Sequence, residues 1–323
     1  MQFHTSNSNS LPYQSVILMD MNFPEIEAFL AICRHKNYTR AAAELGISQP
    51  ALTRRIALLE SDFGGALFER GRHGAHTTAM GEAFIPHATK ALAELRAGTR
   101  AVEQVRDGEA GRLTLAIAGT IPNTQVLQTL RAFRDQFPAM QLQVQTGTSN
   151  EVSQLVENGE ADLGIRYFPG KSPVLESQLI AMETGSIVAA NPTGLLNLDD
   201  VSLESLSQCP WIMFPIGEGS SGEPMAQRAL ALLNQHGIRP DHVIRIDGLS
   251  AQKRLLASDF GLAVMQESAI ADELAAGSVQ RICGENIRID FPIHLVSRIN
   301  SHPNAVRNRL VHLLIGTRNE ASG

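Results

Sequence analysis

The sequence predicts two fold classes in one chain: an N-terminal, all-α winged helix-turn-helix domain with a linker helix, and a C-terminal α/β domain. Three observations predict this division. Residues 37–63 hold two short helical patterns separated by a glycine, and an apolar repeat of seven residues follows between positions 84 and 105. Beyond residue 111, apolar runs typical of strands alternate with helical patterns, which indicates sheets covered by helices.

Charge is distributed unevenly along the 323 residues. The chain carries a net charge of −6, which by itself does not suggest a nucleic-acid partner. Residues 31–73, however, hold seven Lys/Arg against four acidic residues, so this segment is +3 and the remainder is −9. A locally basic segment inside an acidic protein predicts a surface for phosphates.

Cysteine usage and hydropathy predict a cytoplasmic protein that does not enter a membrane. Cys33, Cys209 and Cys283 are too widely spaced for a disulfide framework, and inert buried thiols are favoured over a Cys209/Cys283 redox switch. No signal peptide is recognisable, and no apolar run is long enough to span a bilayer. Residues 1–20, rich in Ser, Asn and Gln, are expected to form a disordered leader.

The first ordered elements are three helices. Residues 24–34 place apolar side chains at i, i+3, i+4 and i+7 and form the supporting helix. Residues 39–45 form a short helix that Gly46 ends, since glycine adopts a left-handed C′ conformation without steric cost. Ser48 is a good N-cap for the next helix, and Pro50 is tolerated in its first turn. Two short helices joined by a tight turn form a helix-turn-helix.

The helix after Ser48 has two different faces. Leu52, Ile56, Leu59 and Phe63 share one helical side and should be buried. The opposite, N-terminal side presents groups that can bind base edges and phosphates in a major groove. These DNA-binding candidates are Ser48, Gln49, Pro50, Thr53, Arg54 and Arg55. The alternative is an ordinary helical hairpin with a solvated basic face.

A short apolar segment between glycines, residues 67–70, predicts a hairpin wing beside this helix. Arg70, Arg72 and His73 would then point along the DNA backbone or into a minor groove. His73 and His76 lie three residues apart, but no third ligand is near in the sequence, so no metal site is predicted. No cofactor is predicted either.

A long linker helix should run from Thr77 or Thr78 to about Arg106, and Pro86 should bend it. Its apolar positions repeat with spacings of four and three, the pattern of a two-helix seam. The seam residues are Phe84, Ala88, Ala91, Leu95, Gly98, Val102 and Val105. We interpret the seam as a dimer contact, and the alternative is packing on the helix's own domain.

The remaining residues predict mostly parallel sheets in two lobes, because about 210 residues exceed what one compact sheet usually holds. Strands are expected at residues 113–118, 141–145, 162–165, 186–190, 211–214, 243–246, 262–265 and 293–296. Helices are expected at 123–136, 149–158, 223–236, 250–257 and 303–315. Ligands of such sheets bind beyond the carboxyl ends of the strands, here in the cleft between the lobes.

The motifs together resemble those of the LysR-type transcriptional regulators. They are Ile26-Glu27-Ala28-Phe29, Ala41-Ala42-Ala43-Glu44-Leu45, Ser48-Gln49-Pro50-Ala51-Leu52-Thr53-Arg54, Leu67-Phe68-Glu69-Arg70, and the glycines of residues 155–165. The resemblance implies a homodimer or homotetramer that binds promoter DNA and a small effector. It also implies a type-2 periplasmic-binding-protein-like effector domain of two subdomains. The domains would be residues 1–20 (leader), 21–78 (DNA-binding), 79–110 (linker) and 111–323 (effector-binding).

The resemblance also implies site residues. Gln49, Pro50, Thr53 and Arg54 would contact the DNA, and Arg70 and Arg72 would hold its backbone from the wing. Hydroxyls and helix amides suited to a carboxylate would come from Thr120, Thr148 and Ser149. The second lobe would contribute Phe214, Pro215, Ser220 and Ser250. For Thr120 and Ser149 there are two alternatives, namely contact with the effector or helix capping alone. Arg166 follows a strand at the cleft and either pairs with an anionic effector or forms a surface or interdomain ion pair.

Two other functions compete with that of a regulator. An α/β enzyme would need a nucleophile, and Ser250-Ala-Gln-Lys253 matches S-x-x-K, but its companion motifs are absent and Ser250 is a natural helix N-cap. The glycine-rich residues 217–222 lack the Gly-Lys-Ser/Thr of a phosphate loop. A solute-binding protein with a helical dimerisation appendage would need an export signal. The sequence therefore predicts a regulator and not an enzyme.

Overall fold

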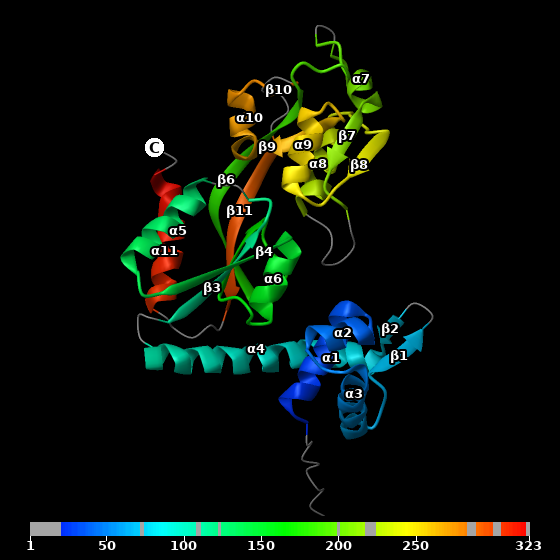
Figure 1. Ribbon diagram of the computed structural model, residues 1–323, viewed down its shortest axis with the longest axis vertical. Helices are drawn as coiled ribbons and strands as arrows, with labels where there is room; N and C mark the ends of the chain where they lie inside the picture. Colours follow the sequence, from blue (N-terminus) through cyan, green and yellow to red (C-terminus); the bar gives the residue numbers. More distant parts are fainter. Residues whose placement is uncertain are drawn as a thin grey trace, which may run out of the picture. The chain divides into compact units, whose positions relative to one another are not determined.

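A computed structural model describes residues 21–71, 74–107, 111–121, 124–198, 201–216, 224–282, 289–299 and 305–320. The predicted leader, residues 1–20, lies outside this description. The chain divides into two compact units after Leu92, within one long helix (Figure 1).

The N-terminal unit consists of three helices, a two-stranded hairpin and the start of a fourth helix. These are α1 (Phe23–His35), α2 (Tyr38–Glu44), α3 (Gln49–Phe63), β1 (Phe68–Gly71), β2 (Gly74–Thr77) and α4 (Ala79–Asp107). The predicted helix-turn-helix and wing are therefore confirmed. Phe29 is fully buried at the centre, and its ring lies 5.3 Å from that of Phe68 and 5.1 Å from that of Phe84.

Local chemistry explains where the helices begin and end. The Asn37 side chain caps α2 by accepting hydrogen bonds from the amides of Thr39 (2.9 Å) and Arg40 (3.0 Å). Gly46 adopts the left-handed conformation expected of it, with φ of 64°. Ser48 caps α3 as predicted, because its Oγ accepts a hydrogen bond from the Ala51 amide at 3.3 Å.

The wing docks on the connection between α1 and α2. β1 and β2 pair antiparallel, with Phe68 opposite Thr77. The Ala75 amide donates to the Lys36 carbonyl at 2.9 Å, which fixes β2 beside the end of α1. Gly74 has φ of 119°, and a Cβ built there would lie 2.4 Å from the same carbonyl oxygen. This close approach requires glycine.

The C-terminal unit contains one sheet with strand order β4-β3-β5-β11-β6-β9-β7-β8, and β10 pairs with β6. Its strands are β3 (Arg112–Ala118), β4 (Gln141–Gly147), β5 (Leu163–Tyr167), β6 (Leu175–Ala190), β7 (Pro210–Met213), β8 (His242–Arg245), β9 (Leu262–Gln266), β10 (Val279–Arg281) and β11 (Ile289–Arg298). Its helices after α4 are α5 (Thr124–Gln136), α6 (Ser149–Glu157), α7 (Leu203–Gln208), α8 (Pro224–Gln235), α9 (Leu249–Ala257), η3 (Glu267–Ala269), α10 (Ala271–Ala275) and α11 (Ala305–Glu320).

The prediction of parallel strands holds within each lobe but not between the lobes. β3 pairs parallel with β4 and β5 in the first lobe, and β7 pairs parallel with β8 and β9 in the second. Between them, β6 and β11 pair antiparallel over most of their length and join the lobes (Figure 1). The first half of β6 was not predicted, because its residues, among them Glu176 and Gln178, look polar in sequence. The ladder with β11 satisfies its backbone there.

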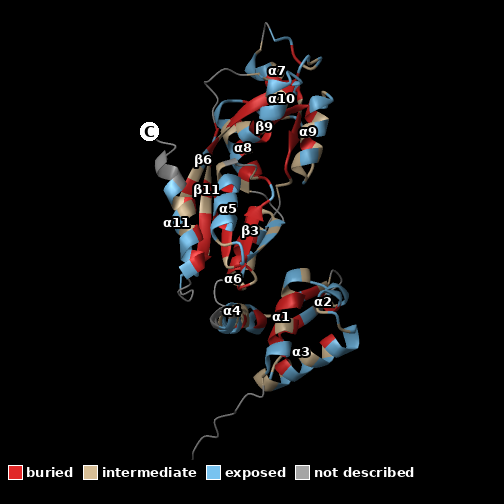
Figure 2. Ribbon diagram, turned by 60° about the vertical axis from the view of Figure 1, so that its left-hand side comes forward, coloured by how far each residue is buried: buried red, intermediate tan, exposed pale blue. Residues whose placement is uncertain are grey.

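Each lobe buries its own core, and the strands β3, β6, β9 and β11 carry much of the buried surface (Figure 2). Phe133, Leu163 and Tyr167 are among the buried residues of the first lobe's cluster. Trp211 is buried in the second lobe's cluster with Leu206 and Leu262. The first cluster also includes Phe214, Met225 and Ala226 of the second lobe, so the two lobes pack on each other as well.

Candidate DNA-binding surface and effector cleft

The first two turns of α3 present a polar and basic surface. Ser48, Gln49, Pro50 and Arg54 are exposed, and Thr53 is half-buried. Arg55, the sixth candidate, is also half-buried. On the other side of the helix, Leu52, Ile56 and Leu59 are buried against the N-terminal core, as predicted.

A hydrogen bond between helices orients one of these candidates. The Thr39 hydroxyl on α2 donates to the Gln49 side-chain oxygen on α3 at 3.1 Å. The Gln49 amide group keeps its two N–H donors for another acceptor. Thr39 was not among the predicted site residues, although its place in the helix before the turn was a usable signal.

An ion-pair cluster ties α1 to α2. The Glu44 carboxylate accepts from the Arg34 guanidinium and contacts the His35 ring. Partial burial alone would raise the pKa of Glu44, but the hydrogen bonds and charges of Arg34 and His35 outweigh it and lower the pKa. The carboxylate is therefore favoured in its charged form, and its ion pairs join the end of α1 to the end of α2.

The wing candidates stay predictions. Arg70 belongs to β1, but its side chain is not described, and Arg72 and His73 lie outside the described residues.

A cavity of about 480 Å³ lies between the two lobes of the C-terminal unit. The first lobe contributes the ends of β3 and β4 and the first turn of α6, and the second contributes the end of β7 and the start of α9. Four of the predicted effector residues line it: Thr120, Thr148, Phe214 and Pro215. The cleft therefore lies beyond the carboxyl ends of parallel strands, as expected for such sheets.

Thr148 caps α6 in a capping box. Its hydroxyl accepts from the Glu151 amide at 3.2 Å, and the Glu151 carboxylate accepts from the Thr148 amide at 2.7 Å. Ser149 is fully buried, and its hydroxyl accepts from the Tyr167 amide at 3.3 Å. Ser149 is not among the residues that line the cavity.

The structure places the other predicted residues differently. Arg166 is 5% exposed, and its guanidinium donates to the Ser153 hydroxyl and to the Tyr167 carbonyl. It lies neither at the surface nor among the residues lining the cavity. Ser220 lies outside the described residues. Ser250 is exposed and is the second residue of α9. The expectation that it caps this helix is wrong, because Gly248 is the N-cap.

Three polar side chains that line the cavity were missed by the sequence analysis. Thr146, Glu151 and Asp247 lie at the ends of predicted strands or in a predicted first helical turn, which was a usable signal. The Thr120 hydroxyl is enclosed and has no hydrogen-bond partner in the part of the chain that is described. An enclosed, unsatisfied hydroxyl beside a cavity is a group that a ligand can satisfy.

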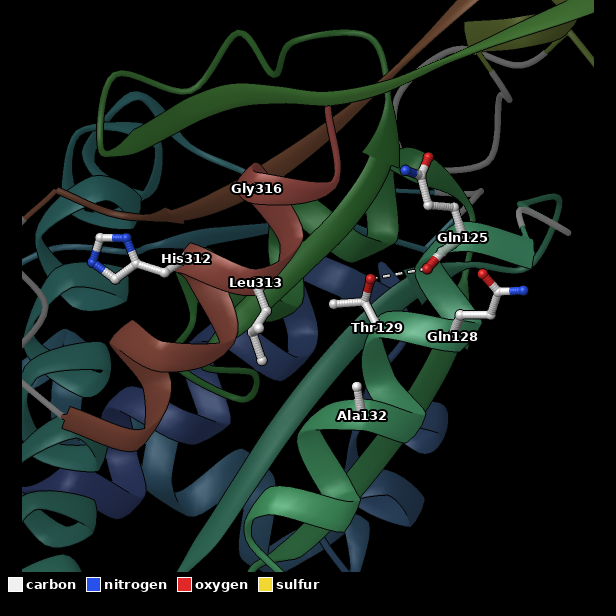
Figure 3. Close-up of a pocket in the computed structure, with 7 residues that line it drawn as sticks. All are labelled: Gln125, Gln128, Thr129, Ala132, His312, Leu313 and Gly316. Carbon is white, nitrogen blue, oxygen red and sulfur yellow. Dashed lines mark hydrogen bonds between the residues drawn. The ribbon is translucent and has the colours of Figure 1, made fainter. Parts of the chain in front are cut away.

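A second cavity, of about 420 Å³, lies between α5 and α11 (Figure 3). Gln125, Gln128 and Thr129 line it from α5, and His312 and Leu313 from α11. The Thr129 hydroxyl already donates to the Gln125 carbonyl at 2.9 Å. This groove lacks the unsatisfied buried hydroxyl that distinguishes the cleft, so we assign it no ligand.

Burial disfavours the reactive thiolate form of the two described cysteines. Burial, with a smaller effect of Glu82, raises the pKa of Cys33 to about 12. Burial and the charge of Asp259 raise the pKa of Cys209. Both thiols therefore stay protonated near neutral pH, which disfavours oxidation. Cys283 lies outside the described residues. No helix in the described ranges has the length and apolar character needed to cross a membrane.

Comparison with known families matches both parts of the chain. Residues 23–82 match the bacterial regulatory helix-turn-helix protein, lysR family, and residues 106–317 match the LysR substrate binding domain. TfdT of Cupriavidus pinatubonensis is 30% identical over 62% of this chain and 88% of its own length. CfxR of Cupriavidus necator is 24% identical over 82% of each chain. Both are described as HTH-type transcriptional regulators.

Solved structures share the fold. CbnR, a LysR family transcriptional regulator, superposes with a TM-score of 0.57 at 24% identity and covers 92% of this chain and 99% of its own. Full-length BenM gives a TM-score of 0.54 at 19% identity and covers 94% and 98%. With a helix-turn-helix, a two-lobed α/β domain and family matches over both, the chain belongs to the LysR family of transcriptional regulators.

Proposed function

We propose that this regulator reads duplex promoter DNA with the N-terminal face of α3, works as a dimer joined along α4, and responds to a small effector in the cleft. The observation that carries the proposal is the exposed polar and basic start of α3 on a helix whose other side is buried. Such a helix suits a major groove, where side-chain donors and acceptors read base edges.

Individual residues have different roles in this proposal. Gln49, oriented by Thr39, and Arg54 carry the donors and acceptors that contact base edges. Ser48 and Arg55 flank them and suit phosphates, while Pro50 and Thr53 complete the surface. Arg70 and Arg72 on the wing would hold the neighbouring backbone. Full-length CbnR has a solved structure in complex with its target DNA, and likeness to that fold supports the proposal.

A dimer along α4 is supported by exposed apolar side chains. Leu95 is 42% exposed and Val102, seven residues later, is 71% exposed. Phe84 and Ala88, which we assigned to the same seam, instead belong to the N-terminal core. The seam we propose therefore starts near Leu95. Two α3 helices in such a dimer would enter successive major grooves about 34 Å apart. Pairing of dimers into a homotetramer, and action in the cytoplasm, belong to the same proposal.

The cleft supports a small organic effector with a carboxylate. Helices α6 and α9 both begin at the cavity, and amides of a helix's first turn attract anions. The hydroxyls of Thr120 and Thr148 line the same space. Effector binding between the lobes would change their separation and thereby the way that dimers bind DNA.

The DNA-binding part is tested by Arg54→Ala in the full chain. A duplex is first selected from a random library with the unaltered protein, and affinities are then compared by gel shift at fixed salt. We expect a loss of roughly ten- to a hundredfold in affinity for the selected duplex, the equivalent of one good base contact. Arg228→Ala, an exposed arginine on α8, is the matched control and should bind as before. Unchanged affinity in Arg54→Ala would refute the assignment of α3.

A further inference from the structure

The charged side chains that line the cleft do not suit a ligand that carries only a negative charge. The two charged side chains among its lining residues are both acidic, Glu151 on α6 and Asp247 before α9. The lining residues that the structure describes include no Lys, Arg or His. The segments that follow Ile121 and Ile216, residues 122–123 and 217–223, contain none either. Among the described lining residues, a plain carboxylate would therefore meet two negative charges and no positive side chain.

The start of α9 is the place for the anionic group. α6 is already capped by Thr148 and Glu151, so its first turn has a negative group of its own. α9 differs, because its N-cap is Gly248 and no side chain caps it. Within the described residues, no side chain caps its first-turn amides, from Leu249 onward, and these amides concentrate partial positive charge at the cavity.

Asp247 is the place for a cationic group. It lines the cavity directly before α9, is exposed, and does not cap that helix. Over the described ranges, its carboxylate has neither a hydrogen bond nor an ion pair. A carboxylate that faces a ligand cavity without a protein partner attracts an ammonium group. Glu151, although engaged by its capping box, adds a second negative charge to the same space.

Thr120 gives an independent sign of a polar ligand. The residue is only 8% exposed and lines the cavity, and its hydroxyl oxygen lacks a hydrogen-bond partner within the described parts of the chain. A hydroxyl both donates and accepts, so it can bind either a carboxylate or an ammonium group. Phe214, Pro215 and Leu249 add apolar surface to the same cavity.

We propose that the effector is a zwitterion of the amino-acid class, with a modest apolar side chain. Its carboxylate binds the first turn of α9, its ammonium group faces Asp247, and its side chain packs on Phe214 and Leu249. The cavity volume of about 480 Å³ lies within the range of small-molecule sites. This inference rests on the proposed function of the cleft and narrows the effector from organic anions to zwitterions.

The test compares matched molecules by thermal shift of the full-length protein. Each of the twenty amino acids is titrated, and leucine and phenylalanine are paired with analogues that lack one charge. For leucine these are 4-methylpentanoate and 3-methylbutylamine, and for phenylalanine 3-phenylpropanoate and 2-phenylethylamine. We expect at least one amino acid to raise the melting temperature with concentration, and its single-charge analogues to bind at least tenfold more weakly.

Asp247→Asn supplies the second arm. It should weaken binding of that amino acid at least tenfold and leave the melting temperature of the free protein unchanged. Asp272→Asn, an exposed acid on α10, is the matched control and should bind the amino acid as the unaltered protein does. The proposal is overturned if no amino acid stabilises the protein, if a desamino acid binds equally well, or if Asp247→Asn binds unchanged. Gel shifts without added effector test the DNA-binding function separately.

Discussion

Glu44 holds the first two helices in register through Arg34 and His35, and its lowered pKa predicts how the N-terminal unit responds to acid. A carboxyl whose pKa is lower in the folded state stabilises the fold at pH values above its unfolded pKa, near 4.5. That contribution is lost as the pH falls through the folded pKa. The side chains are about one-third exposed, so solvent screening limits the contribution to at most about 1 kcal/mol.

The measurement is hydrogen exchange of residues 23–44 in the full chain, for the unaltered protein and Glu44→Gln. At pH 7 the variant should exchange faster, and the difference should shrink as the pH falls below 4.5. A difference that stays constant between pH 7 and pH 3 would contradict the assignment of this carboxylate.

Tyr167 is the second residue from which we derive a prediction. Its buried hydroxyl lies 2.6 Å from a Glu183 carboxylate oxygen, to which it donates, and 3.2 Å from the Thr120 carbonyl oxygen. It accepts from the Gln266 amide at 3.1 Å, so it links β5 of the first lobe to β6 and to β9 of the second. Tyr167→Phe keeps the ring and leaves buried polar groups unsatisfied, which should cost about 1–3 kcal/mol.

Urea unfolding followed by fluorescence of Trp211, the chain's one tryptophan, measures this loss in the effector domain. Ser258→Ala removes an exposed hydroxyl from the same domain and should change the free energy of unfolding by less than about 0.5 kcal/mol. Equal effects of the two substitutions would show that the hydroxyl network contributes nothing to stability.

At the scale of elements, the wing depends on one glycine. An alanine at position 74 would need a φ of 119° and would place its Cβ 2.4 Å from the Lys36 carbonyl oxygen, so the backbone must move. We expect Gly74→Ala to destabilise the N-terminal unit by more than about 1–3 kcal/mol. The strained backbone conformation alone costs that much, and the steric clash of the Cβ with the Lys36 carbonyl oxygen adds to it.

Gly46→Ala is the matched comparison for the wing. Gly46 also has a positive φ, 64°, but nothing lies within 4 Å of a Cβ built there. Gly46→Ala should therefore lower the free energy of unfolding by only about 1–2 kcal/mol, the cost of a left-handed conformation for a residue with a Cβ. Hydrogen exchange of residues 23–71 in each variant shows which substitution destabilises the N-terminal unit more. A smaller loss in Gly74→Ala than in Gly46→Ala would contradict docking of the wing on Lys36.

For the whole molecule, α4 is the element on which the proposed dimer depends. Its 29 residues correspond to a rod of about 44 Å. The double variant Leu95→Asp/Val102→Asp places charges in the proposed seam, so we expect it to be monomeric in analytical ultracentrifugation. The variant should also bind DNA more weakly, because a monomer cannot contact two half-sites at once. Leu203→Asp, an exposed leucine on α7, should leave the mass unchanged. A dimeric double variant would place the contact elsewhere.

The sequence by itself determined the elements whose causes are local. Gly46, Ser48 and the spacing of Leu52, Ile56 and Leu59 set the helix-turn-helix, because caps and 3.6-residue periodicity act over a few residues. The alternation of apolar runs in the same way predicted an α/β effector domain and the strand ends that line its cleft.

Only the tertiary structure decided the features that depend on residues far apart in sequence. The polar start of β6 becomes a strand because β11, more than a hundred residues later in the chain, pairs with it. Asp247 and Thr120, whose side-chain oxygens have no partner among the described residues, come to one cavity from different lobes. Such features arise from contacts between residues that are more than a hundred positions apart in the sequence, and no local sequence pattern encodes such contacts.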